Sequence, residues 1–385
     1  MSAVSTFAAE QEVGKMNAFF SILPTLGNRW AKTRPWEGSV IGLNLHLTTI
    51  TAALVRELIL GGGVWIVSAA NEATTDPATV ELLRNVGVQV YTGGDLENRF
   101  QQVLEHEPDL LVDVGFELLD TLLDKRPDHA SSVKGAVELT RSGITRLRRR
   151  ENIPFPVINI NDGRLKNAVE NRHGVGEAVW QAVTQLTGIH LAGRRVLVIG
   201  YGPVGRGLAH YARAAGTSVE VIESDPVARL FAHYDGFPTP SLEDGLSRAA
   251  LVVTATGQAG ALTLTDLEHS ENDLILVNAG HGGDEIDVEG IERAAVSKDN
   301  VARQVARYRL ESGQRVSVLG AGHPLNIVLN SGSPEPVLLH FAVLGLSLER
   351  LATSADFANG ENIVSDDIER SAAQLALQAL DPVGR

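Results

Sequence analysis

The chain has 385 residues, of which 44% are hydrophobic and 21% charged, values typical of a globular protein with more than one domain. Its net charge of −14 argues against nucleic acid as a partner, because phosphate backbones are bound by clusters of Lys and Arg. It contains no cysteine, which excludes disulfides, thiolate metal sites and a cysteine nucleophile.

The first 15 residues are small and polar, and we expect them to lack a fixed structure. They show no basic start followed by an apolar core, and no apolar run in the chain has the length of a membrane span. We therefore expect a cytoplasmic protein without a membrane partner.

Strand-like and helix-like runs alternate through the first 160 residues. We predict strands at 40–45, 64–68, 88–91, 110–114 and 157–160, and helices at 51–60, 77–86 and 95–105. A helix at 175–186 precedes strands at 196–199, 218–222, 251–254, 274–278 and 316–319, and two apolar helices follow at 337–351 and 363–380. This alternation predicts an α/β fold with two doubly wound parallel sheets and a ligand in the cleft between the domains.

A glycine-rich turn lies between the strand at 196–199 and the next helix. It has the sequence GYGPVG from Gly200 to Gly205, and Glu223 ends the following strand. The pattern is that of a dinucleotide-binding turn, in which Gly200 allows the tight turn, Gly202 the approach of a pyrophosphate and Gly205 close helix packing. An acid at Glu223 favours NAD over NADP, whose 2′-phosphate it would repel. The alternative is an α/β unit whose glycines serve only packing.

Two other patterns favour no special site. The basic run at 146–150 is short, and we interpret it as a solvated helix face rather than a phosphate patch. The 11 histidines show no spacing typical of metal ligands, so we expect no metal.

Several motifs have counterparts in one enzyme family. Residues 200–207 are similar to GYGDVGKG, 252–257 to VVTTTG, 278–287 to N-x-G-H…E-I-D, and 304–310 to QVDRYRL. Outside that half, residues 45–48 are similar to LHMT, and residues 161–171 to the segment N-D-S-V-T-K-x-K-F-D-N. Over residues 38–375 the chain thus resembles the S-adenosyl-L-homocysteine hydrolase family.

The resemblance implies a Rossmann NAD domain, residues 177–332, inserted in a substrate domain made of residues 1–176 and 333–385, with hinges near Asn171 and Ser331. It also implies NAD as cofactor, a nucleoside-like substrate and a homo-oligomer, either a dimer or a tetramer. In this family, NAD temporarily oxidises the ribose 3′-carbon, so that homocysteine leaves and water adds without net redox change.

Five residues carry catalytic roles by resemblance. Lys166, Glu170 and Asn171 would act at the 3′-oxygen, His46 would assist the leaving group and water, and His281 would face the nicotinamide. From the residues alone, Lys166 is equally a surface lysine, and His46 equally a core histidine.

The resemblance also implies two sets of binding residues. Those for the substrate are Thr48, Asp113, Glu138, Thr140 and His323, the last being equally a histidine fixed in a turn. Those for the cofactor are Asn171, Gly200, Gly202, Pro203, Val204, Gly205, Glu223, Thr254, Thr256, Gly257, Asn278, Gly280 and His281.

The chain departs from the family pattern at several polar positions. Val114, Leu139, Ile50, Val318 and Val175 stand where the family has a catalytic aspartate, a ribose-binding glutamate, an adenine-reading residue, a carboxamide-binding asparagine and a cysteine. The sequence ends at Arg385 without the family's C-terminal tail, from which we expect weaker, exchangeable NAD. Two alternatives to the family's hydrolysis therefore stay open: a repurposed NAD(H)-dependent dehydrogenase or reductase, and a non-catalytic NAD-binding regulator.

Overall fold

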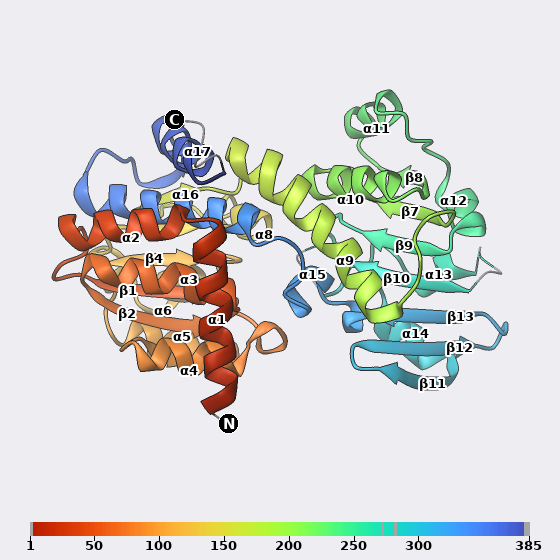
Figure 1. Cartoon of the computed structure of the whole chain (residues 1–385), viewed down its shortest axis with the longest axis horizontal. Coiled ribbons are helices and arrows are strands. Elements are labelled where there is room, and N and C mark those ends of the chain that lie inside the picture. Colours follow the sequence, from red (N-terminus) through yellow and green to blue (C-terminus); the bar gives the residue numbers. More distant parts are fainter. Residues whose placement is uncertain (1–2, 269, 271–272, 281–282, 381–385) are drawn as a thin grey trace. The chain divides into compact units, whose positions relative to one another are not determined.

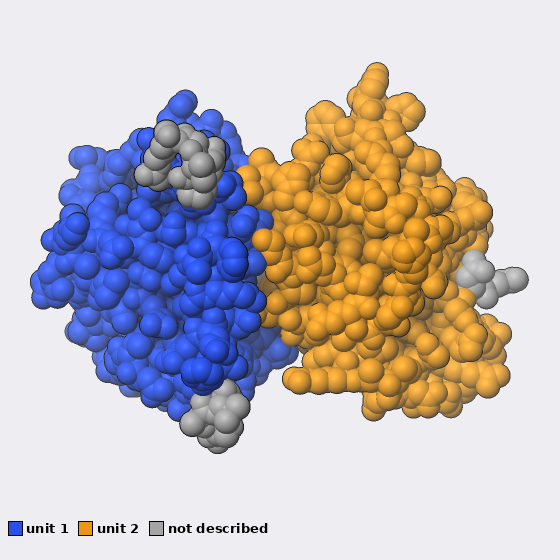
Figure 2. All heavy atoms as spheres, viewed as in Figure 1, with its two compact units in different colours: residues 1–166, 334–385 blue, residues 167–333 orange. Residues whose placement is uncertain are grey.

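The computed structural model describes residues 3–268, 270, 273–280 and 283–380. The chain forms two compact units, unit 1 from residues 1–166 and 334–385 and unit 2 from residues 167–333 (Figure 2). The first boundary therefore follows Lys166, where we expected it at 176. Residues after 166 pack with unit 2, because the Arg172 carbonyl oxygen would lie only 2.0 Å from a Cβ placed at Gly207.

Unit 1 contains a seven-stranded sheet in the order β14-β6-β5-β4-β1-β2-β3, and every neighbouring pair is parallel (Figure 1). The strand order reverses between β1 and β4, which places a ligand-binding crevice at the carboxyl ends of these two strands. The strands are β1 (Val40–Leu45), β2 (Val64–Ala69), β3 (Gln89–Tyr91), β4 (Leu110–Asp113), β5 (Gly135–Glu138), β6 (Pro156–Asn159) and β14 (Gly360–Ile363).

Helices cover the sheet of unit 1. Apolar side chains of α5, α6 and α8 share one core with the strands, and α16 packs against β4, β5, α2 and α3. The helices are α1 (Ala3–Phe19), α2 (Ile22–Thr33), α3 (Thr49–Leu58), α4 (Pro77–Asn85), α5 (Leu96–Leu104), α6 (Glu117–Lys125), α7 (Pro127–Ala130), α8 (Arg141–Leu147), α16 (Glu335–Thr353) and α17 (Asp366–Leu380), with short 3₁₀ turns η1 (Ile59–Gly61) and η2 (Glu72–Thr74).

The N-terminal segment is helical, so the expectation that residues 1–15 lack a fixed structure was wrong. Ala9, Val13 and Met16 lie on one side of α1 and are buried, and the helix packs against α3 and α4. Three small or flexible apolar residues at helical spacing are enough for docking, although few residues of the segment are strongly apolar.

The long apolar helix α16 also corrects an expectation. By length and composition alone it could cross a membrane, whereas we found no run of that length in the sequence. Within the hydrophobic window, 67% of the residues are buried inside the protein, as in the core helix of a globular domain.

Unit 2 contains a second seven-stranded sheet, in the order β11-β12-β13-β10-β9-β7-β8. The strands from β13 to β8 are parallel, β11 and β12 are antiparallel, and the order reverses between β7 and β9. The strands are β7 (Arg195–Ile199), β8 (Ser218–Ile222), β9 (Leu251–Thr254), β10 (Leu274–Asn278), β11 (Ala295–Ala302), β12 (Val305–Leu310) and β13 (Arg315–Leu319).

Helices α9 and α10 pack on one face of this sheet, and α12 and α14 on the other (Figure 1). The elements are η3 (Lys166–Val175), a stretch of π-helix, α9 (Gly176–Thr187), α10 (Pro203–Ala214), α11 (Pro226–Tyr234), α12 (Leu242–Arg248), α13 (Leu264–Leu267), α14 (Val288–Ala294), η4 (Gly320–Gly322) and α15 (Leu325–Val328). The α/β class with two parallel-dominated sheets is thus confirmed.

Candidate functional site

The glycine turn between β7 and α10 has the geometry that the sequence predicts. Gly200 has a φ of 99°, and a Cβ there would lie 2.6 Å from the Ala255 carbonyl oxygen. A Cβ at Gly205 would lie 1.9 Å from the Gly200 carbonyl oxygen, so α10 can approach β7 only because this residue is glycine. By contrast, a Cβ at Gly202 would meet nothing within 4 Å. Gly202 therefore borders open space at the N-terminus of α10, where backbone N–H groups favour an anion.

Two further cofactor positions, Pro203 and Val204, form the first turn of α10. Glu223 follows β8, beside this turn. Its carboxylate accepts hydrogen bonds from the backbone N–H of Tyr201 at 2.7 Å and of Asp225 at 2.8 Å. The acid therefore holds the glycine turn and remains placed at the strand end where a ribose hydroxyl would donate.

The loop after β9 is fixed by Glu285, a fully buried residue that we had treated only as part of a motif. Its carboxylate accepts from the backbone N–H of Thr256 at 2.9 Å and of Gly257 at 2.7 Å, and from the Thr256 hydroxyl at 3.0 Å. Gly280 packs directly on this carboxylate, since a Cβ there would lie 1.5 Å from an oxygen. The N-x-G-H…E-I-D pattern thus encodes a support for the β9 loop.

Asn278 ends β10 and is fully buried. Its side chain donates to the Gly322 carbonyl oxygen at 2.8 Å and accepts from the Gly280 N–H at 2.7 Å and the Thr254 hydroxyl at 3.3 Å. His323 follows β13, and its ring lies against Gly283, where a Cβ would be 2.6 Å from Nδ1. The predicted position His281 lies outside the described residues.

In unit 1, His46 follows β1, and Nδ1 lies 2.7 Å from the Thr74 hydroxyl. Thr74 donates its hydroxyl proton to the Asn71 carbonyl oxygen at 3.0 Å, so it accepts from His46 Nδ1–H. This tautomer places the lone pair of a neutral imidazole on Nε2, as an acid–base residue requires. Thr48, the next predicted residue, caps α3 by accepting from the Thr51 N–H at 3.5 Å.

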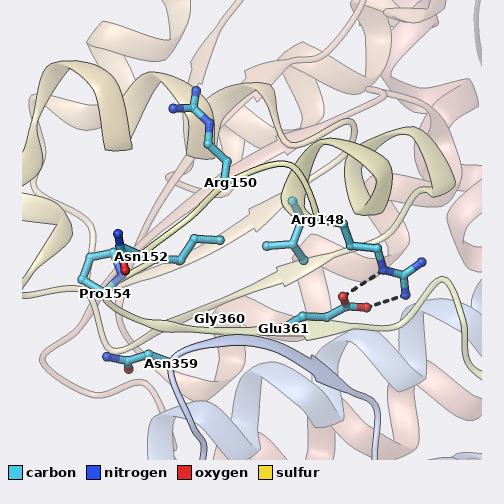
Figure 3. A pocket seen from close by; sticks show the side chains of 9 residues that line it. Arg148, Arg150, Asn152, Pro154, Asn359, Gly360 and Glu361 are labelled. Atoms are coloured by element: carbon cyan, nitrogen blue, oxygen red, sulfur yellow. Dashed lines mark hydrogen bonds and ion pairs between the residues drawn. The ribbon is translucent and has the colours of Figure 1, made fainter.

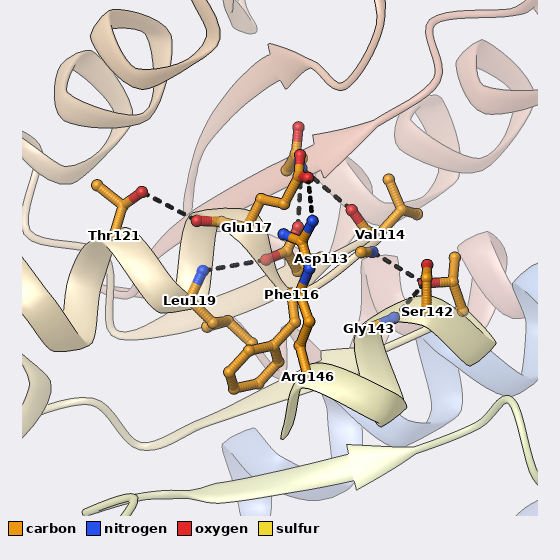
Figure 4. Close-up of polar contacts among 12 residues, drawn as sticks. Asp113, Val114, Phe116, Glu117, Leu119, Thr121, Ser142, Gly143 and Arg146 are labelled. Carbon is orange, nitrogen blue, oxygen red and sulfur yellow. Dashed lines mark hydrogen bonds and ion pairs between the residues drawn. The ribbon is translucent and has the colours of Figure 1, made fainter. Parts of the chain in front are cut away.

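Three predicted substrate residues follow β4 and β5. Asp113 and Glu138 are fully buried, and Glu138 accepts from the Thr140 hydroxyl at 2.7 Å. In Figure 4, the Leu119 N–H points at Asp113, at 3.0 Å, and Gly143 lies over the same region. Both carboxylates are therefore below the surface on which a ligand would lie.

The remaining catalytic candidates share one element. Lys166, Glu170 and Asn171 all lie on η3, and Glu170 is buried. π-Helical turns occur preferentially at functional sites. His340, on the buried face of α16, was missed by sequence reasoning; burial and then the Lys166 charge lower its pKa well below the usual range, so the imidazole is neutral. A single histidine within the otherwise apolar run at 337–346 was the available signal.

A hollow of about 700 Å³ lies away from these residues, at the amino ends of β6 and β14 (Figure 3). Arg148 lines it and makes a two-pronged ion pair with Glu361, at 2.6 and 2.9 Å. Arg150 pairs with Asp120 and Asp124. The basic run therefore pins α8 to β14 and α6, and its charges are neutralised.

Comparisons with known proteins agree with the geometry. The family model described as S-adenosyl-L-homocysteine hydrolase, NAD binding domain, matches residues 171–332. An S-inosyl-L-homocysteine hydrolase of Methanopyrus kandleri is 35% identical, with 93% of this chain and 88% of that protein aligned. The chain belongs to the S-adenosyl-L-homocysteine hydrolase family. An adenosylhomocysteinase of Archaeoglobus fulgidus is 32% identical over 94% of this chain and 92% of its own length.

Membership of this family makes the chain an enzyme of adenosylhomocysteinase type with NAD as its cofactor. Among solved structures, a dipicolinate synthase from Bacillus halodurans has a TM-score of 0.51 and 12% identity, covering 82% of this chain and 99% of its own. At that identity the likeness concerns the fold alone. The open space at Gly202 and the carboxylate of Glu223 fit the pyrophosphate and ribose of NAD.

Proposed function

We propose that the enzyme hydrolyses the thioether bond of an S-nucleosyl-L-homocysteine whose base is adenine or hypoxanthine. The observation that carries the proposal is the 35% identity, over 93% of the chain, to a protein named S-inosyl-L-homocysteine hydrolase, beside relatives named adenosylhomocysteinase. The retained His46, Lys166 and Asn171 support a catalytic role over a purely regulatory one.

The base is left open because Ile50 stands where the family reads adenine. An aliphatic side chain neither donates nor accepts a hydrogen bond, so it cannot tell a 6-amino from a 6-oxo group. Sites without a polar reader discriminate weakly between analogues of similar size. We therefore propose that both substrates are accepted.

When bound, NAD supplies the oxidant for the ribose 3′-carbon. In the proposed mechanism, Lys166 takes the proton of the 3′-hydroxyl, and Glu170 and Asn171 orient the lysine and the hydroxyl. His46, with its proton on Nδ1, uses Nε2 to take a proton from water and to return one to the leaving thiolate.

We also propose a homo-oligomer in the cytoplasm. On α11, four apolar side chains at helical spacing are exposed, and a second copy of the chain would cover them: Val227, Leu230, Phe231 and Tyr234.

The test is incubation of the protein with NAD and either S-adenosyl- or S-inosyl-L-homocysteine, with mass spectrometry of the products and absorbance at the NADH band. Release of nucleoside and homocysteine without net NADH, abolished in Lys166→Met, is the expected result. Net NADH without homocysteine would instead indicate a repurposed dehydrogenase, and bound NAD without turnover a regulator.

A further inference from the structure

A row of buried polar side chains crosses the sheet of unit 1, at or next to the last residue of five neighbouring strands. In strand order they are Ser68, Asn44, Asp113, Glu138 and Asn159, and each is fully buried. Asp113 pairs in register with Glu138, and Glu138 with Asn159. Because buried polar groups are costly to place in a core, such a row indicates a specific task.

Glu138 joins two loops through its carboxylate. Oε1 accepts from the N–H of Gly115 at 3.1 Å, from the N–H of Thr140 at 2.8 Å and from the Thr140 hydroxyl at 2.7 Å. Oε2 accepts from the Phe116 N–H at 3.0 Å. The loop after β4 and the loop after β5 are thus held by the same two oxygen atoms.

The backbone around Glu138 shows why this support is needed. Phe116 has a φ of 61° and is fully buried, a left-handed conformation that costs a non-glycine residue about 1 kcal/mol. A Cβ at Gly143 would lie 2.2 Å from Oε1, so the backbone of α8 covers the carboxylate. Glu138 therefore faces protein on every side that its contacts define.

Asp113 performs the same task one strand away. Oδ1 accepts from the Asn44 side chain at 2.8 Å, and Oδ2 from the Leu119 N–H in the first turn of α6 at 3.0 Å. Asn44 in turn accepts from the Ser68 hydroxyl at 3.1 Å. The row therefore links β2, β1, β4 and α6 directly below the predicted substrate edge.

We propose that Glu138 and Asp113 are positioning residues, which fix the loops after β4 and β5 in the shape that nucleoside binding requires without contacting the nucleoside. This rests on the proposed function, which supplies the nucleoside. Burial raises the pKa of Glu138 to about 7, and burial together with the Glu138 charge raises the pKa of Asp113 well above its usual range. Such shifts fit carboxyls that are closed off from solvent and ligand.

Two variants test the role. Glu138→Gln keeps the shape but turns one acceptor into a donor that faces backbone N–H groups. Gly143→Ala pushes a methyl group into the carboxylate and removes no group that could bind a ligand. Both should weaken the binding of adenosine and inosine, measured by calorimetry, by about tenfold or more. NAD affinity should stay unchanged, and the double variant should bind little worse than either single one.

Asp109→Asn is the matched control. Asp109 lies just before β4, at its amino end, and accepts from the Val40 N–H at 2.8 Å, so its loss costs a similar bond far from the loops. Its nucleoside affinity should stay within about twofold of the unmodified protein. Weak binding in Glu138→Gln with normal binding in Gly143→Ala would make Glu138 a direct ligand and overturn the proposal, as would normal binding in both.

If the unmodified protein binds neither nucleoside, the proposed function fails, and hydrogen exchange decides the positioning role separately. The amides of Gly115, Phe116 and Thr140 should lose protection in Glu138→Gln and keep it in Asp109→Asn. Unchanged protection in Glu138→Gln would overturn the positioning role.

Discussion

At the scale of single residues, Thr74 determines which nitrogen of His46 carries the proton. Its hydroxyl donates to the Asn71 carbonyl oxygen and so can only accept from Nδ1–H. The hydroxyl of the next residue, Thr75, donates to the same carbonyl oxygen at 2.8 Å, so its proton goes to the backbone. Two adjacent threonines in one turn therefore separate a catalytic from a structural contribution.

Thr74→Val should lower kcat by about fivefold to tenfold, the equivalent of one lost hydrogen bond, with a smaller change in KM. The reason is that the imidazole loses the acceptor that selects its tautomer. Thr75→Val loses a comparable bond and should retain its kcat. Steady-state kinetics with the accepted substrate checks this, and equal losses of kcat in the two variants would contradict the role of Thr74.

Glu285 makes a similar argument for the cofactor. Glu285→Gln places an amide opposite the N–H groups of Thr256 and Gly257 and should loosen the loop after β9. We expect NAD affinity, measured by calorimetry, to fall by about tenfold. Asp287→Asn, which alters only the cap of α14 at the Gly290 N–H, is the control and should keep its NAD affinity.

At the scale of elements, the β7–α10 turn separates the folding and the binding roles of its glycines. Gly202 has a φ of −70° and open space around it, so Gly202→Ala should fold normally and lose NAD affinity, because the methyl group occupies the pyrophosphate position. Gly205→Ala collides with backbone and should lower the melting temperature as well. Thermal unfolding without NAD checks the pair; a destabilised Gly202→Ala would contradict the open geometry.

The same comparison of elements shows what the sequence could predict. The parallel strands with apolar runs and the glycine turn were found, because hydrophobic periodicity and close backbone packing leave local signals. Strand β11 was missed because almost every residue in it is exposed, and β14 because its four residues begin where the apolar helix pattern was placed. Short β5 starts at Gly135, which breaks the strand pattern.

Site residues divide in the same way. Residues that follow a strand end, such as His46 and Glu223, were identified by position and motif. The support groups were not, because Thr74, Glu285 and His340 lie far in sequence from the groups that they affect. Their signal was a lone polar residue at the end of an apolar run, which by itself does not reveal its partner.

At the scale of the whole molecule, two buried groups in unit 1 give its stability opposite dependences on pH. The pKa of Glu138 is raised from 4.5 to about 7, so its contribution is fully present below pH 4.5 and is lost as the pH rises through about 7. The pKa of His340 is lowered well below 6.5, so its contribution is present above pH 6.5 and is lost as the pH falls. Between these limits the two slopes partly cancel.

Removing either group should therefore expose the slope of the other. Glu138→Gln should melt at a higher temperature at about pH 7.5 than at about pH 5.5, relative to the same difference in the unmodified protein, and His340→Gln should change in the opposite direction. The full shift of Glu138 corresponds to at most about 3 kcal/mol, on the basis of roughly 1.4 kcal/mol per pKa unit. Scanning calorimetry at the two pH values measures the difference. Because both variants lose buried polar groups, absolute melting temperatures will fall in each, and only the sign of the change with pH tests the argument; identical signs would mean that at least one of the two groups is not titrating as its burial requires.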